Sequence, residues 1–123
     1  MVVRFVTDAA FAQWLETEWE NCFEWDAANT EKLSKHGLTP AAVEALFAQA
    51  AVSAGRIEPA DGAAWATGET RHLVLLVSAE AKAFSLVCTR RGDALRPISC
   101  RRSRDDERRF YENACPPSDG RGL

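Results

Sequence analysis

The residues best suited to chemistry are arginines that gather toward the C-terminal end of the chain. All basic side chains between residues 90 and 109 are arginine and none is lysine: Arg90, Arg91, Arg96, Arg101, Arg102, Arg104, Arg108 and Arg109. A guanidinium is planar, carries five N–H donors and grips phosphate at two points, whereas a lysine ammonium is a point charge. This strip of arginines favours contact with phosphate or RNA.

The strip stands out because the chain as a whole is acidic. Its 123 residues carry 18 Asp and Glu against 15 Lys and Arg, a formal net charge of −3. Residues 1–31 hold seven acids and one base, a net of −6, whereas residues 90–109 hold four acids and eight bases, a net of +4. The alternative is a solvated helix face whose charges pair internally, as Asp105 and Arg109 can do. Charge alone leaves both interpretations open.

Length and composition predict one globular domain. Hydrophobic residues make up 46% and charged residues 27% of the chain, so general disorder is not expected. The longest purely apolar run is residues 73–77, far short of the roughly 20 residues that a membrane-spanning helix needs. No secretory signal is recognisable, so we expect a cytoplasmic protein.

The cysteines do not indicate a metal site. Cys22, Cys88, Cys100 and Cys115 are separated by 65, 11 and 14 residues, so no C-x-x-C pair of a zinc site is present. Because nothing indicates export, we expect reduced thiols that behave as small hydrophobic side chains, and no metal or other cofactor.

Capping residues and apolar spacing predict a short strand and three helices in the first half of the chain. The strand covers about residues 2–6, the first helix about 9–20 and the second about 27–37, and the third begins at Pro40. The expected N-terminal caps are Asp8, Asp26 and Thr39. The apolar face of the first helix is formed by Phe11, Trp14, Leu15 and Trp19.

Strands are predicted in the second half. The clearest cover about residues 70–78, 82–90 and 94–101, and residues 51–69 fit a possible strand followed by a loop. A Gly-Asp pair at 92–93 joins the last two strands, with glycine first as a type II′ turn prefers.

The chain is expected to end in a helix. Ser103 can cap it with support from Asp106, and the helix stops before Cys115. Residues 116–123 are expected to form a flexible tail. Helices followed by an antiparallel meander and a last helix predict an α+β fold in two layers.

Two ordered segments carry a recognisable pattern. The first has Phe-Glu-Trp-Asp at 23–26 and Lys-His-Gly-Leu-Thr-Pro at 35–40, with Asn29 and Lys32 between them. The second has Arg-Pro-Ile-Ser-Cys-Arg-Arg at 96–102, followed by Glu-Arg-Arg-Phe-Tyr-Glu at 107–112; Thr-Arg-Arg-Gly at 89–92 precedes it. Over about residues 23–113 the chain resembles the BrnT family of bacterial type II toxins.

The resemblance implies a two-layer RelE-like ribonuclease fold and metal-independent RNA cleavage, in which the 2′-hydroxyl attacks the adjacent phosphate. That reaction needs a base, an acid and cations around the developing charge. By resemblance, Arg101 and Arg71 bind phosphate, Glu107 is the base, and His36 or Lys35 is the acid. The residues expected to contact RNA are Arg91, Arg102, Arg108 and Tyr111. Each of these residues also has an ordinary structural explanation, such as ion pairing, helix capping or core packing.

The resemblance also implies a partner. It is a BrnA-like antitoxin with a ribbon-helix-helix DNA-binding part, which forms a hetero-oligomer with the toxin and represses its own operon. RNA would be the substrate, and DNA contact would come only through the antitoxin.

Two alternatives stay open. One is a non-catalytic module of the same fold that acts as a corepressor or as an RNA- or protein-binding partner. The other is a structural interaction protein in which residues 1–22 drive self-association. The expected organisation is an N-terminal extension over 1–22, a toxin domain over 23–115 and the tail.

Overall fold

The computed structural model of the protein describes residues 3–49 and 51–114. Within these parts it holds five strands and four helices: β1 (Val3–Thr7), α1 (Ala9–Thr17), α2 (Ala27–Ser34), α3 (Pro40–Gln49), β2 (Ala51–Pro59), β3 (Arg71–Val77), β4 (Ala83–Arg91), β5 (Ala94–Arg102) and α4 (Asp105–Ala114). None of these helices is long and apolar enough to cross a membrane.

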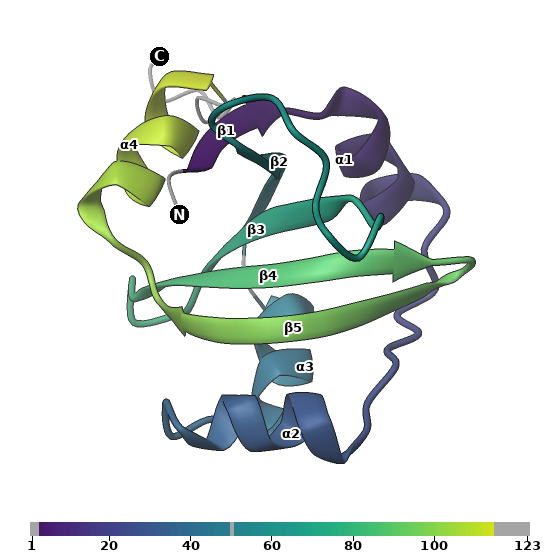
Figure 1. Ribbon diagram of the computed structural model, residues 1–123. Coiled ribbons are helices and arrows are strands. Elements are labelled where there is room, and N and C mark those ends of the chain that lie inside the picture. Colours follow the sequence, from purple (N-terminus) through teal and green to yellow (C-terminus); the bar gives the residue numbers. More distant parts are fainter. Residues whose placement is uncertain (1–2, 50, 115–123) are drawn as a thin grey trace.

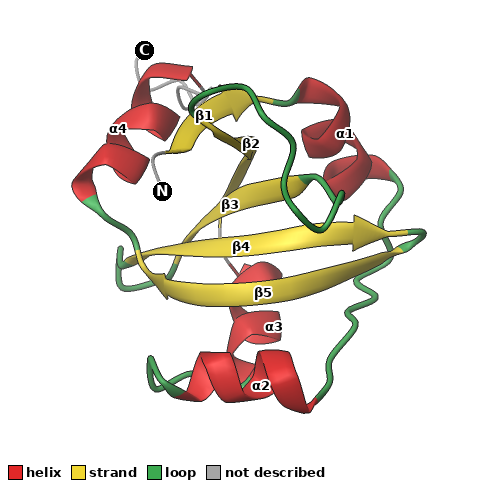
Figure 2. Cartoon of the chain, in the orientation of Figure 1, coloured by secondary structure: helices red, strands yellow, loops and turns green. Residues whose placement is uncertain are grey.

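The strands form one antiparallel sheet in the order β1-β2-β3-β4-β5, so each strand pairs with its neighbour in the chain (Figure 1). Helices and sheet together confirm the predicted α+β class; the RelE-like detail stays a prediction. In the view of Figure 2, α2 and α3 lie together below the sheet, and α4 lies at the upper left beside β1.

The sheet has two distinct faces because side chains alternate along each strand. One face carries Leu86, Cys88 and Cys100 and packs against α1, α2 and α3, which contribute Trp14, Leu33 and Val43 among others. The opposite face carries a smaller apolar cluster formed by Ile57 and Leu73 with Phe5, Trp65, Leu75 and Val87. The helix α4 lies over this second face, because its Glu107 bonds to Ser85 and Arg101 there.

The first three helices begin where their caps were predicted. The Asp8 carboxylate accepts from the Phe11 N–H, and the Thr39 hydroxyl accepts from the Ala42 N–H. Asp26 forms a reciprocal capping box with Asn29, whose N–H donates to the Asp26 carboxylate. Each of these three hydrogen bonds is 3.1 Å long. The first helix is shorter than predicted and ends at Thr17. Trp19 nevertheless packs against the main core, since the chain turns back there.

The cap predicted for the last helix is wrong by one residue. The helix α4 starts at Asp105, and the Arg104 N–H donates to Glu107 Oε1 at 2.8 Å. Ser103 still extends the sheet, because its N–H donates to the Ala83 carbonyl. Its hydroxyl hydrogen-bonds to the Ser85 hydroxyl at 2.8 Å.

The hairpin of β4 and β5 sets which face each arginine occupies. Its turn has φ +61° at Gly92, as the sequence predicted. A β-bulge follows: Cys88 pairs with Pro97 but Val87 pairs with Ser99, so one residue of β5 has no partner. From there the register places Arg101 opposite Ser85.

The cysteines divide between core and surface. Cys88 and Cys100 are buried in the main core, and burial raises the pKa of both thiols, that of Cys100 to about 12. Cys22 is exposed, and Cys115 lies outside the described residues. The two buried thiols act as small hydrophobic side chains, as predicted.

Candidate active site

Arg101 and Glu107 form a two-point ion pair where β5 leads into α4. Nη1 of Arg101 lies 2.9 Å from Oε1 of Glu107, and Nη2 lies 2.6 Å from Oε2. Arg101 projects from the sheet face that carries α4, and Glu107 is in the first turn of that helix. The structure thus brings together two of the residues predicted for catalysis.

The Glu107 carboxylate is buried and fully hydrogen-bonded. The residue is 3% exposed, and Oε1 also accepts from the Ser85 hydroxyl at 2.9 Å and from the Arg104 N–H at 2.8 Å. Burial alone would raise its pKa, but the bonds from Arg101, Arg104 and Ser85 outweigh it, so the pKa of Glu107 lies below its usual range. The carboxylate is therefore ionised and fixes the guanidinium of Arg101.

Arg101 keeps one edge available for a ligand. Its Nη1 and Nη2 each give one N–H to Glu107, and Nη1 also donates to the Arg102 carbonyl. Within the described residues, Nε–H and the second N–H of Nη2 have no hydrogen-bond partner. The side chain is 23% exposed. A phosphate can therefore receive two parallel N–H bonds along this edge while Glu107 holds the other.

Arg71 is not part of the Arg101–Glu107 pair. It stands at the start of β3, and its guanidinium lies 4.4 Å from the ring centroid of Trp65. Across the sheet, Arg101 of β5 pairs with Ser85 of β4, and Ser85 pairs with Leu75 of β3. Arg71 is therefore two strands away from Arg101 and four residues along β3 from Leu75. On a flat sheet the two Cα atoms would be about 17 Å apart. Arg71 and Arg101 share a face of the sheet, but they occupy separate places on it.

Arg91 is held in a network of acids at the tip of the β4–β5 hairpin. Its Nε lies 2.9 Å from Glu69, and its Nη1 lies 2.8 Å from Glu24. The pKa of Glu69 is lowered, mainly by the hydrogen bond from Arg91. Arg96 binds Glu24 and Asp26 beside it. This network ties the hairpin to the segment before α2, which matches the structural explanation of Arg91.

The predicted acids Lys35 and His36 lie in the helical layer. Lys35 is the C-cap of α2, and both side chains are exposed. Leu33 of this helix packs on the sheet face opposite to Arg101. In the described part of the chain, no hydrogen bond or ion pair joins Lys35 or His36 to Arg101 or Glu107.

The arginine strip therefore does not form a single surface. Arg102 donates to the Ala83 carbonyl and lies 5.5 Å from the ring centroid of Phe84. Arg108 pairs with Asp105 at 2.7 Å, in place of the predicted pair of Asp105 with Arg109.

Arg90 and Tyr111 give no further support to the candidate site. Arg90 lies 4.1 Å from the ring centroid of Trp14, on the helix-covered side of the sheet. It is thus separate from the candidate site. The side chain of Tyr111 lies outside the described residues.

Sequence reasoning missed Ser85 and Trp65. Ser85 is 1% exposed and donates to Glu107 from near the start of β4, the hairpin partner of β5. The alternation of β4 gave a signal, because Ser85 is a polar residue in an otherwise apolar stretch. Trp65 lies in the loop before β3, and the four tryptophans of the chain gave no reason to prefer it.

Side chains that commonly bind metal ions do not cluster in the described residues. Among residues 3–49 and 51–114, no three His, Cys, Asp or Glu side chains come together in a way that could hold an ion.

Comparison with known families places this domain. The family model described as "Ribonuclease toxin, BrnT, of type II toxin-antitoxin system" matches residues 25–107. This range begins after α1 and includes both Arg101 and Glu107. A search of curated proteins found no matching sequence.

Proposed function

Since the chain belongs to the BrnT family of ribonuclease toxins of type II toxin–antitoxin systems, we propose that it cleaves RNA without a metal ion and is neutralised by a cognate antitoxin. The observation that carries the proposal is the Arg101–Glu107 pair. It supplies a fixed cation with one open edge at the surface of a ribonuclease-toxin domain.

The proposed reaction is an internal transfer at phosphorus. The 2′-oxygen of RNA bonds to the adjacent phosphorus, and the bond to the 5′-oxygen of the next nucleotide breaks. The products end in a 2′,3′-cyclic phosphate and a 5′-hydroxyl, and no water is consumed. Negative charge grows on the phosphate oxygens in the transition state, where a preorganised guanidinium stabilises it most. Arg101 is proposed to provide this charge.

Glu107 is proposed mainly as the positioning residue of Arg101. All its hydrogen bonds are used in holding Arg101, Arg104 and Ser85, and its lowered pKa makes it a weak proton acceptor. Its role as general base, and that of His36 or Lys35 as general acid, stay predictions. A base role would require Arg101 to release one carboxylate oxygen as it turns onto the phosphate.

The proposed partner is an antitoxin of the BrnA type with a ribbon-helix-helix DNA-binding part. Membership in a toxin–antitoxin family implies an antitoxin, and the resemblance supplies its type. We propose that it covers Arg101 or an adjacent part of the same sheet face, because blocking the open guanidinium edge would prevent phosphate binding.

The test is incubation of the purified protein with a defined single-stranded RNA in EDTA. Cleavage that leaves 2′,3′-cyclic phosphate ends, and that stops when the cognate antitoxin is added, is the expected result. Products with 3′-hydroxyl ends would contradict the proposed chemistry. Intact RNA, both free and in translating ribosomes, would favour the non-catalytic binding module.

A further inference from the structure

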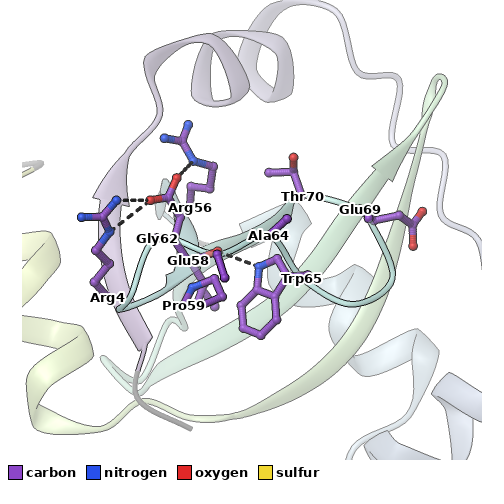
Figure 3. Close-up of a pocket in the computed structure, with 12 residues that line it drawn as sticks. Arg4, Arg56, Glu58, Pro59, Gly62, Ala64, Trp65, Glu69 and Thr70 are labelled. Atoms are coloured by element: carbon purple, nitrogen blue, oxygen red, sulfur yellow. Dashed lines mark hydrogen bonds and ion pairs between the residues drawn. The ribbon is translucent and has the colours of Figure 1, made fainter.

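A pocket opens between the β1–β2 edge of the sheet and the loop that leads into β3, apart from the candidate active site (Figure 3). Its volume is about 360 Å³. Arg4 comes from β1, Arg56 and Glu58 come from β2, and Trp65 and Glu69 come from the loop. No step of the proposed reaction uses this pocket.

One wall of the pocket is an aromatic ring in a fixed orientation. The Trp65 indole N–H donates to the Ile57 carbonyl at 3.0 Å, and the Arg71 guanidinium lies 4.4 Å from the ring centroid. Trp65 also packs against the apolar cluster of its sheet face. Arg71 covers one face of this partly exposed ring, so a nucleobase, which stacks on aromatic rings regardless of sequence, would use the remaining exposed part.

Another wall is an ion-paired group with no excess charge. Arg4 Nη2 lies 2.7 Å and Arg56 Nε lies 2.8 Å from the two oxygens of Glu58, and the pKa of Glu58 is lowered, first by the bond from Arg4 and then by that from Arg56. With Glu69, the charged residues that line the pocket are two bases and two acids. A bare phosphate gains little from such balanced walls. A neutral base, with donors and acceptors on its edges, finds partners of both kinds.

We infer that this pocket binds one nucleobase of the RNA strand that Arg101 holds by its phosphate, an inference that rests on the proposed function. The Trp65 wall of the pocket lies on the same face of the sheet as Arg101, because Trp65 clusters there with Leu75 and Val87. The charged wall of Arg4, Arg56 and Glu58 alternates onto the opposite face at the β1–β2 edge. Arg71, which lies over the Trp65 ring, is about 17 Å from Arg101 on a flat sheet. The bound base therefore belongs to a nucleotide away from the cleaved bond. Arg4 lies outside the range of the family match.

The test follows the tryptophan indole N–H signals of the ¹⁵N-labelled protein by NMR. Trp65→Phe identifies the Trp65 signal. The four nucleoside 5′-monophosphates, inorganic phosphate and a hexaglutamate peptide are titrated separately. At least one nucleotide should shift the Trp65 signal saturably, and inorganic phosphate and the peptide should not.

Calorimetry of the same nucleotide with variants gives the second readout. Trp65→Ala should weaken binding roughly five- to hundredfold, the range that stacking of one base on an aromatic ring contributes. Trp25→Phe is the matched control: Trp25 also donates one side-chain hydrogen bond, to Glu44, but it packs in the main core. It should bind as the wild type does. If Trp65→Ala does not fold, Arg4→Met, on the exposed edge strand, should weaken binding at least threefold.

Three results would overturn the inference. Equal shifts from phosphate and nucleotides would mean an anion contact only. A shift from the acidic peptide alone would mean a protein-binding surface, and no shift from any probe would mean no site. Because these titrations need no turnover, nucleotide binding without cleavage would refute only the proposed function. Cleavage without nucleotide binding would refute only the pocket.

Discussion

Replacement of Glu107 by glutamine tests the buried ion pair most sharply. Glutamine keeps the volume and one carbonyl oxygen, so the Ser85 hydroxyl and the Arg104 N–H keep an acceptor. The amide NH₂ then takes the place of Oε2 and faces Nη2 of Arg101, now 2.6 Å away, donor against donor. The variant loses the hydrogen bond from Nη2 of Arg101, and the bond from Nη1 remains on a neutral amide oxygen in place of a carboxylate.

The expected cost follows from the geometry. A hydrogen bond to a charged group contributes about 1.5–3 kcal/mol, and loss of the carboxylate charge also weakens the remaining Nη1 bond, so together they give roughly 3–5 kcal/mol. Arg101 is 23% exposed and regains part of its hydration, which lowers the expected loss in free energy of unfolding to about 2–4 kcal/mol. For a domain of this size that is a fall in melting temperature of roughly 10 °C.

Equilibrium unfolding in urea at pH 7 measures the loss. The midpoint should fall with an unchanged m-value, which shows that stability and not compactness has changed. The control is Asp105→Asn, because Asp105 pairs with Arg108 at an exposed position and should change stability by no more than about 0.5 kcal/mol. A loss below about 1 kcal/mol in Glu107→Gln would refute the buried, fully bonded carboxylate.

Three further predictions concern single residues. Ser85→Ala should cost about 1–2 kcal/mol in the same titration, and no loss would show that Glu107 does not need its hydroxyl. Burial lowers the pKa of His72 below 6.5, so as pH falls the unfolded chain binds a proton at this histidine before the folded chain does. Thermal stability should therefore fall as pH drops from about 7.5 to 5.5. His72→Gln should flatten that fall and His36→Gln should not; equal slopes would contradict the burial argument. Gly92→Ala, at φ +61°, should cost about 1 kcal/mol, and unchanged stability would mean that the turn rearranges.

Features that depend on neighbouring residues in the chain were predictable. Asp8, Asp26 and Thr39 begin their helices as expected, because a cap bonds to an N–H two or three residues on. Gly92 marks its turn for the same local reason. The meander followed because short turns join neighbouring antiparallel strands.

The site depended on a long-range feature that local patterns do not contain. If the β4–β5 pairing continued from the turn at Gly92 without a bulge, Arg101 would pair with Phe84. Phe84 packs against the helix-covered core, so Arg101 would then point to that face. The bulge beyond Pro97 shifts the register by one residue and turns Arg101 to the side of Ser85 and Glu107. Because one residue of slip changes the face, the pairing with Ser85 was not accessible from the sequence.

The stacking of Arg71 on Trp65 was missed for a related reason. Trp65 sits in a loop rich in small residues, and no periodic pattern relates it to β3. Its place is fixed by a bond to the Ile57 carbonyl on the neighbouring strand, which only the folded chain provides. Arg71 was expected to bind phosphate together with Arg101 because of the family resemblance.

The most direct test of the central claim compares the metal-free cleavage rates of Arg101→Ala and Arg90→Ala. Both remove one arginine from the same hairpin, but Arg90 lies over Trp14 on the helix-covered side. Arg101→Ala should lower the rate about a hundredfold or more, the loss typical of one preorganised donor to a developing oxyanion. Arg90→Ala should stay close to the wild type. Equal rates for Arg101→Ala and the wild type would contradict the account.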